Sequence, residues 1–514
     1  MIFTAPTTTT TTPTASASAA AAAASVAVCA VVASAVWWKK TQHRAGDTNA
    51  AHATPIDLLP NECSIVIKTT PSISTITFFA AGTQKDVEAA KEHFEKKTRA
   101  IVASNPWLAG RLEPKRDGGL SLLVPTEKNY EKNKNANSNS NTFFSILERP
   151  EGSSPLREED YHTMVQKLQP ALCGTTEETL KNPSAPLWKV TFVTTAAPVD
   201  GEPSSKTTTT TTTSGFALVV SANHSILDGH GYYRIFNMLS SGEPVDVVSP
   251  QRRHDLTGPI KEAMGDEPGF LDEPSLGFIL RFVVSMVRNL VFPQTKSIAF
   301  VVSKEWIRAQ KDKHLQTNDD GAAAICITKP PFVSTNDVVV SSFFRVTDCD
   351  LALMAINLRG RVPGCTDDLL GNYEDVLAYC RGDYESPASI RKSISGPPPF
   401  QRIGAGQETK TRELPTNWEH FTRCTYAVIT NWATFARELK AVVPGDDENN
   451  CLVSQTLHLP LIDFPASTPA CTYGSMVVFR PKLGEIGILA GGTEAMCEKL
   501  KASGMVGSLL YSIK

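Results

Sequence analysis

Residues 216–239 read FALVVSANHSILDGHGYYRIFNML, and they are the most informative segment of the sequence. An apolar run of strand length ends at His224, and Asp228 and Gly229 then bend the chain. Apolar residues recur at helical spacing after the bend. The stretch therefore predicts a strand, a turn and a helix, with an imidazole at the end of the strand. Functional groups are held most accurately on rigid elements of this kind.

The imidazole of His224 has two interpretations. As a neutral ring with a pKa near the operating pH, it can take a proton from a hydroxyl or an amine, which makes it a candidate general base. Alternatively, it is a buried ring that caps the strand end and bonds to the backbone. Asp228 could orient the ring as in a triad, or it could be a buried carboxylate that bonds to an arginine and fixes the loop. His230 is expected to lie at the start of the helix without a role.

Length and charge limit the classes of protein. A chain of 514 residues is too long for one hydrophobic core, so two packed domains with a cleft between them are expected. The 50 Lys+Arg and 53 Asp+Glu give a net charge of -3, which argues against a nucleic-acid partner. The 11 cysteines are scattered, without a C-x-x-C pair or a histidine at zinc-ligand spacing, so they predict buried thiols and no metal site.

The N-terminal segment contains a stretch of membrane-spanning length. Residues 19–38 read AAAAAASVAVCAVVASAVWW, carry no charge and are followed by Lys39 and Lys40. The positive-inside rule would place the chain after this anchor in the cytosol. The alternatives are a cleaved signal, an organelle-targeting leader or a low-complexity leader, which would leave a soluble cytoplasmic or organellar protein.

Strand-like and helix-like segments alternate along the rest of the chain, which predicts an α/β fold with mixed sheets flanked by helices. Strands are expected at 72–81, 187–194, 216–222, 297–302, 323–327, 424–429 and 474–479, and a helix at 84–104. The expected organisation is a leader at 1–50, a first domain at 51–245, a crossover linker at 246–296 and a second domain at 297–514.

The linker contains an apolar stretch, LGFILRFVVSMVRNLVF at 276–292. Its two charged residues, Arg281 and Arg288, are seven residues apart and share one helical face. The stretch is too short and too charged for a confident membrane span. It predicts either a helix packed on the second domain or an in-plane membrane helix with its arginines at the headgroups.

The hexapeptide HSILDG at 224–229 resembles the H-x-x-x-D-G signature of the chloramphenicol-acetyltransferase-like superfamily. That superfamily includes the BAHD acyltransferases, the wax ester synthase/diacylglycerol acyltransferases and peptide-synthetase condensation domains. Further segments resemble the family in the expected order: NPWLAGRL at 105–112, PLWKV at 186–190, VSTND at 333–337, and NLRGR at 357–361 followed by Gly371-Asn372. The resemblance thus covers roughly residues 75 to 480.

Two departures identify a divergent member. Asn223 stands where condensation domains and wax ester synthases carry a second histidine. Ile462-Asp463-Phe464-Pro465 stands where BAHD enzymes carry D-F-G-W-G, so Asp463 is a candidate substrate-binding residue on this resemblance.

The resemblance implies two chloramphenicol-acetyltransferase-like domains with an active-site channel between them. It implies transfer of an acyl group from acyl-CoA, as co-substrate, to a small or lipophilic alcohol or amine, with no bound cofactor. His224 would be the base, and Asp228, next to Gly229, would pair with Arg361 or Arg359. The loop Ser334-Thr335-Asn336 would line the acyl-CoA channel and donate to the thioester oxygen, although the same residues are also strong helix N-caps.

Two alternatives remain at the level of sequence. One is a membrane-associated wax ester or acylglycerol synthase, motivated by the apolar stretches at 19–38 and 276–292. The other is a non-catalytic descendant of the fold that binds a ligand. The chain has no G-x-S-x-G, G-x-x-x-x-G-K-[ST] or H-E-x-x-H motif, which argues against serine hydrolases, nucleotide hydrolases and metalloproteases. A monomer is expected.

Overall fold

The computed structural model describes residues 53–81, 83–125, 143–150, 155–194, 215–265, 270–271, 274–291, 295–319, 332–395, 400, 414–441, 453–463 and 472–511. The anchor expected at 19–38 and the strand expected at 323–327 lie outside these described residues. Within them, every helix is too short or too polar to cross a membrane.

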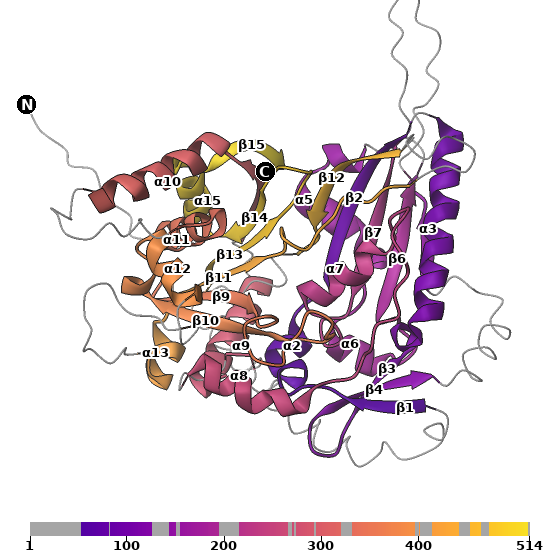
Figure 1. Ribbon diagram of the computed structural model, residues 1–514, viewed down its shortest axis with the longest axis horizontal. Helices are drawn as coiled ribbons and strands as arrows, with labels where there is room; N and C mark the ends of the chain where they lie inside the picture. The colour runs from indigo at the N-terminus through magenta and orange to yellow at the C-terminus, as the bar shows by residue number, and fades with distance from the viewer. Residues whose placement is uncertain are drawn as a thin grey trace, which may run out of the picture.

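A five-stranded sheet forms the core of the first half of the molecule (Figure 1). Its strands, in spatial order, are β12 (Val453–Pro460), β2 (Ile73–Ala81), β7 (Gly215–Ala222), β6 (Trp188–Thr194) and β5 (Phe144–Leu147). β7 is central and pairs antiparallel with β2 and β6. The strands expected at 72–81, 187–194 and 216–222 are therefore confirmed.

The long helix α3 (Gln84–Ser104) covers one face of this sheet (Figure 1). It begins where Thr83 and Asp86 form a reciprocal capping box, which satisfies two backbone donors that a helix start leaves free. Phe94 and Ile101 are fully buried against the sheet. The helix ends at Ser104, before Asn105-Pro106, as the sequence predicted.

The edge strand β12 comes from the second half of the chain. It pairs antiparallel with β2, so that His458 lies opposite Thr77. The expected second domain at 297–514 is thus not separate in space, because residues 453–460 complete the first sheet. Sequence periodicity cannot show this, since strand pairing between distant segments leaves no local pattern.

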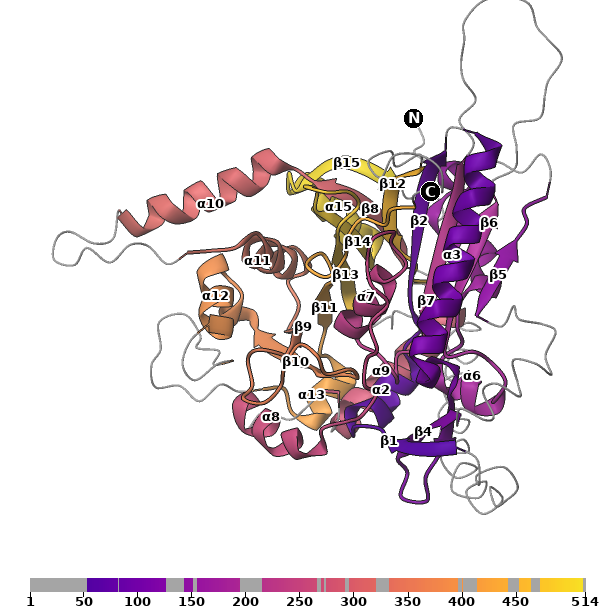
Figure 2. The ribbon, with the colours of Figure 1, turned by 45° about the vertical axis from the view of Figure 1, so that its right-hand side comes forward.

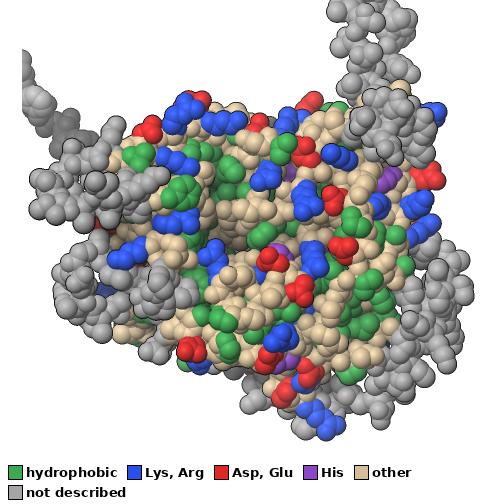
Figure 3. All heavy atoms as spheres, viewed as in Figure 1, with side chains coloured by type: hydrophobic (Ala, Val, Ile, Leu, Met, Phe, Trp, Pro, Cys, Tyr) green, Lys and Arg blue, Asp and Glu red, His purple; other side chains and the backbone are tan. Residues whose placement is uncertain are grey.

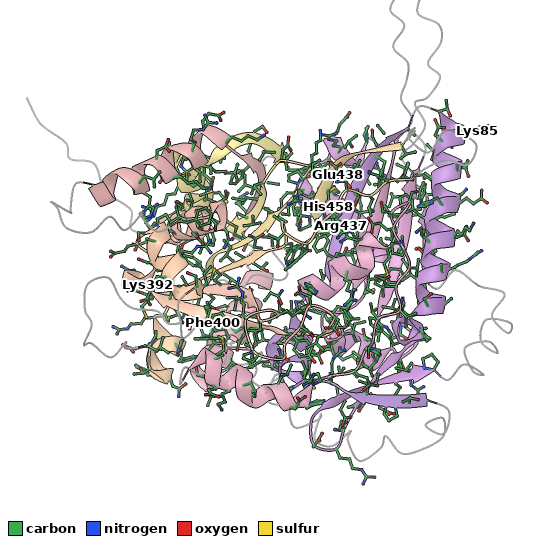
Figure 4. All side chains as sticks on the ribbon, viewed as in Figure 1. Lys85, Lys392, Phe400, Arg437, Glu438 and His458 are labelled. Atoms are coloured by element: carbon green, nitrogen blue, oxygen red, sulfur yellow. The ribbon has the colours of Figure 1, made fainter. Side chains whose placement is uncertain are left out.

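His458 links three elements inside the first half (Figure 4). Its Nδ1 is 2.9 Å from the Thr77 hydroxyl and its Nε2 is 2.9 Å from the hydroxyl of Tyr233. Burial lowers the pKa of His458 to about 3, so the ring is neutral in the folded protein.

We expect His458 to make the protein sensitive to acid. Because its pKa is lower in the folded than in the unfolded chain, the unfolded chain binds the extra proton below about pH 6.5, and stability falls as pH drops toward 3. The largest slope from one such group is about 1.4 kcal/mol per pH unit. Chemical denaturation of the wild type and of His458→Gln between pH 7 and 4 measures it. The variant should show the shallower slope, and equal slopes would contradict this account.

A seven-stranded sheet forms the core of the second half. Its strands, in spatial order, are β10 (Glu374–Cys380), β9 (Leu351–Asn357), β11 (Tyr426–Asn431), β13 (Thr472–Phe479), β14 (Gly487–Gly492), β8 (Lys296–Val302) and β15 (Val506–Tyr511). The strands expected at 297–302, 424–429 and 474–479 are confirmed.

The remaining elements surround the two sheets. A small sheet of β1 (Ala53–Asp57), β4 (Leu120–Pro125) and β3 (Arg111–Pro114) lies at one end of the first half (Figure 1). The helices include α5 (Tyr161–Lys167), α7 (Gly229–Asn237), α8 (Thr257–Met264), α9 (Leu276–Val291), α10 (Lys304–Asp319), α11 (Thr335–Thr347), α12 (Pro387–Ser395), α13 (Asn417–Thr422) and α15 (Glu494–Ala502).

The apolar stretch at 276–292 forms α9, which packs on the second half. The ring of Phe278 is 5.3 Å from the ring of Tyr426 on β11 and 5.7 Å from that of Phe270. α9 also lies against α13. These contacts support the packed helix rather than the in-plane membrane helix, at least for the part of α9 whose side chains are described.

The two halves share buried surface. One core cluster joins Val219 of β7 and Leu459 of β12 to Leu489 of β14, and α5 adds Met164 to it. In both views the helix α7 lies between the two sheets (Figure 2). The structure thus confirms the expected α/β fold with two mixed sheets and flanking helices, and it places the end of β7 and the start of α7 between the halves.

Candidate active site between the two halves

His224 follows the central strand β7 at the point where the two halves meet. Its side chain is 15% exposed, so the ring is neither sealed in the core nor free on the surface. Burial lowers the pKa of His224 below its usual value, and interactions with Asp228 and Asn372 only partly offset this. The imidazole is therefore neutral at physiological pH, which is the form that can accept a proton. The surface of the molecule is hollowed between the two halves (Figure 3).

Asn372, from the second half, fixes the tautomer of this ring. Its amide Nδ2 donates to the backbone carbonyl of His224 at 2.8 Å, which leaves its Oδ1 as an acceptor. That oxygen is 3.1 Å from Nδ1 of His224, so Nδ1 carries the proton and donates it. In the neutral ring the lone pair is then on Nε2. The nitrogen that can accept a proton is thus directed away from Asn372.

Asp228 does not contact the ring of His224; it holds the turn. Its Oδ1 accepts from the backbone of Gly231 at 2.8 Å and so caps α7. Its Oδ2 accepts from Arg359 at 2.6 Å and from the backbone of Tyr373 at 3.1 Å. Both carboxyl oxygens are thus occupied by structural contacts. Of the two roles that the sequence left open, the geometry supports the buried carboxylate that bonds to an arginine.

Of the two candidate arginines, Arg359 makes this pair. Its side chain and that of Asp228 are 0% and 2% exposed. Arg361 instead donates to the carbonyl of Ile394 on α12. Gly229, the first residue of α7, is buried, and a Cβ there would come within 3.2 Å of the indole of Trp432, so a larger residue would crowd the turn.

A second buried ion pair, which the sequence did not reveal, helps to hold Asn372 in place. Glu62 and Arg252 are 0% and 1% exposed in their side chains, with their charged atoms 3.0 Å apart. Glu62 also accepts from the backbone of Asn372 at 2.9 Å, and Arg252 donates to the carbonyl of Ile226. Gly371 lies against both side chains with a φ of +118°, where a Cβ would clash at 2.7 Å. No local motif marks this pair, because its members are 190 residues apart.

The loop Ser334-Thr335-Asn336 lines a cavity of about 390 Å³ in the second half. Ser334 is the N-cap of α11, since its hydroxyl accepts from the backbone of Asp337, so the capping role is present. The cavity is lined by Lys311, Phe332, Ser334, Thr335, Asn336, Val339, Asn431, Ala433, Thr434, Val478, Arg480 and Ile486. Two of these residues are cations, and Lys311 donates to the Thr335 hydroxyl at 3.2 Å. The cavity thus combines an apolar wall with positive charge.

The described contacts of Asp463 are with α5. It follows β12, and its Oδ1 is 3.5 Å from Nδ1 of His162 on α5. The neighbouring backbone amide of Ile462 donates to the hydroxyl of Tyr161. None of the described contacts of Asp463 involves His224 or the cavity beside Ser334, so these contacts connect β12 to α5.

No family model and no curated protein sequence matches this chain. Solved structures do. TRI101 of F. graminearum, complexed with coenzyme A and deoxynivalenol, is 13% identical with a TM-score of 0.53, over 89% of this chain and 100% of that one. TRI101 of F. sporotrichioides, complexed with coenzyme A and T-2, is 13% identical with a TM-score of 0.51, over 88% of this chain and 99% of that one.

The chain therefore shares the overall fold of the two TRI101 structures, with the two mixed sheets and flanking helices described above. The likeness covers nearly the whole of the matched chains. At 13% identity, the chain is a divergent example of this fold.

Proposed function

We propose that this protein transfers an acyl group from a coenzyme A thioester to an alcohol or amine, with His224 as the general base. The observation that carries the proposal is the state of the His224 ring. Its Nδ1 is held by Asn372, its Nε2 has the lone pair, and it lies partly exposed between the halves. A ligand-binding protein would not need a base oriented in this way. The likeness in fold to proteins solved with bound coenzyme A supports the choice of thioester.

The reaction needs one base that takes a proton from the alcohol or amine and then gives it to the departing thiolate. The O–H or N–H bond of the acceptor breaks as its proton moves to Nε2 of His224, and the freed lone pair bonds to the thioester carbonyl carbon. When the tetrahedral intermediate collapses, the C–S bond breaks and the thiolate takes the proton from Nε2. The products are the ester or amide and free coenzyme A, and His224 is neutral again.

The cavity beside α11 is the proposed site for coenzyme A. A nucleotide with phosphate groups is attracted to Lys311 and Arg480, and an apolar wall that includes Val339 and Val478 suits the pantetheine arm. Thr335 and Asn336 line the same cavity, and we assign them contacts with this arm. The hydroxyl of Ser334 accepts a hydrogen bond as the N-cap of α11, so we assign to Ser334 a role in the shape of the cavity rather than a hydrogen bond to the ligand.

Loss of positive charge in the cavity should weaken binding of coenzyme A without changing the chemical step. For Lys311→Ala and Arg480→Ala we expect KM for the acyl-CoA to rise roughly 5- to 20-fold, as for loss of a charged hydrogen bond, with kcat nearly unchanged. Calorimetric titration with coenzyme A gives the same ranking without turnover. The matched control is Arg308→Ala, an exposed cation on the same helix that lies outside the cavity. An equal effect of the control would contradict the assignment of the cavity.

The proposal is tested by a screen of acyl-CoA thioesters against alcohols and amines. Release of free thiol that depends on the acceptor, with the acylated product found by mass spectrometry, supports it. If the protein binds coenzyme A but releases no thiol with any acceptor, the non-catalytic ligand-binding alternative is favoured. A preference for long-chain acyl-CoA and fatty alcohols would favour a lipid ester synthase.

Three expectations stay predictions. They are the membrane anchor at 19–38, the cytosolic position of the catalytic part, and the monomeric state. Cell fractionation of the full chain and of a chain that starts after Lys40 tests the first two, and light scattering tests the third.

A further inference from the structure

A second titratable side chain faces the reactive nitrogen of His224. Glu374 is the first residue of β10, and its Oε1 is 3.9 Å from Nε2 of His224. Its side chain is 19% exposed, so the two groups meet at the same partly open place between the halves. The family resemblance assigned no role to this residue, and no sequence motif marks it.

The position of Glu374 is fixed from the first half of the chain. The side-chain amide of Asn61 donates to the carbonyl of Asn372 at 2.7 Å, and its contact with the carbonyl of Glu374 is longer, at 3.4 Å. Asn372 is itself bonded to His224. A short network therefore holds the backbone that carries the carboxyl close to the imidazole.

The charges around the pair leave Glu374 without a cationic partner among the described residues. Arg359 is paired with Asp228, and Arg252 is paired with Glu62. The other charged group nearby is a carboxylate, Asp375, on the same strand. His230 is also close to Asp228 and Arg359, but burial lowers its pKa and keeps it neutral. Among the described residues, the titratable group that faces Nε2 of His224 is thus the carboxyl of Glu374, at 3.9 Å.

Asp228 cannot stabilise a charged imidazole by direct contact, because its two oxygens bond to the turn and to Arg359. We infer that Glu374 takes this part as a positioning residue: its ionised carboxylate stabilises the imidazolium that forms on His224 when the acceptor loses its proton. This inference rests on the proposed function. The proton still moves from the acceptor to Nε2 and from Nε2 to the departing thiolate, so the carboxylate changes no bond.

The ionisation of Glu374 sets the pH at which this contact operates. Burial is the main cause that raises the pKa of Glu374 to about 8; the charges of Asp228 and Asp375 add to this rise, and that of Arg359 opposes it. The carboxyl is thus mostly protonated at neutral pH and ionised above about pH 8. Since the ionised form is the one that favours the imidazolium, activity rises as pH increases through this value.

The test compares pH profiles of kcat/KM for the wild type, Glu374→Gln, Glu374→Asp and Asp375→Asn. The kcat/KM of the wild type should rise with increasing pH, with an apparent pKa near 8. In Glu374→Gln the rise near pH 8 should be absent, and only the rise caused by deprotonation of His224, below pH 6.5, should remain. At high pH the kcat/KM of this variant should be roughly 10- to 100-fold below that of the wild type, through a lower kcat rather than a higher KM. In Glu374→Asp the rise in kcat/KM should remain, at a shifted pH. In Asp375→Asn the rise in kcat/KM should remain and should move slightly to lower pH, because the negative charge that raises the pKa of Glu374 is removed.

A second readout needs no substrate and so separates failure of this inference from failure of the proposed function. The ring ¹⁵N signals of His224, identified by their absence in His224→Ala, should show a step near pH 8 in the wild type and none in Glu374→Gln. A step that persists in Glu374→Gln, or an unchanged pH profile in that variant, would overturn the inference even if acyl transfer is demonstrated. If no acyl transfer is found, the ¹⁵N titration alone decides whether Glu374 and His224 are coupled.

Discussion

Replacement of His224 by alanine is expected to lower acyl transfer by roughly 10²- to 10⁴-fold, the range for loss of a positioned general base. The loss should lie in kcat, with KM for the acyl-CoA within a few-fold, because the cavity proposed for coenzyme A is lined by other residues. Steady-state kinetics based on thiol release measure both constants.

The control is structural. His224 is partly exposed, and its ring makes a single described hydrogen bond, to Asn372, so the fold should survive its loss. Circular dichroism and the thermal transition of His224→Ala should match those of the wild type closely. A variant that stays folded and turns over at the normal rate would show that another group accepts the proton.

Replacement of Arg359 by alanine is expected to have the largest effect on stability. It leaves the carboxylate of Asp228 buried without its cation, and breaking a buried pair in this way costs about 3–5 kcal/mol. Arg359 also donates to the carbonyls of Leu369 and Gly371, which would lose their donors. Activity should fall with stability, because the turn that places His224 is held by the same carboxylate. Urea denaturation measures the change in free energy of unfolding.

A neighbouring arginine provides the matched control. Arg361 is two residues away and donates to a backbone carbonyl on α12, so Arg361→Ala should cost about 1 kcal/mol or less. If Arg359→Ala fails to fold, Arg359→Lys should keep the charge but lose the forked contacts, and it should give an intermediate loss. Equal stability of the alanine variants at 359 and 361 would contradict the structural role of the buried pair.

Local pattern was enough to predict the strand, turn and helix around His224. The apolar run of β7, the Asp-Gly turn and the helical spacing after it lie within two dozen residues, so each signal is present in the sequence itself. The capped start of α3 and of α11 was predictable for the same reason, since caps depend on neighbours three residues apart.

The contacts that complete the site connect residues far apart in sequence. Asn372 and Glu374 lie close to His224 in space, although they are about 150 residues from it in the sequence. Glu62 and Arg252, which form an ion pair, are 190 residues apart. Strand β12 joins the first sheet from the second half of the chain. Without an alignment, no residue pattern shows which distant side chains come together. The family resemblance suggested an arginine partner for Asp228, but only the coordinates distinguish Arg359 from Arg361.

The central claim is spatial: thioester and acceptor meet at Nε2 of His224 between the two halves. A crystal structure of this protein with an unreactive thioether analogue of acyl-CoA tests it most directly. The account predicts that the nucleotide lies along the cavity with Lys311 and Arg480, and that the sulfur faces His224 with room for one acceptor oxygen about 3 Å from Nε2. An analogue bound elsewhere, with its sulfur out of reach of His224, would contradict the account.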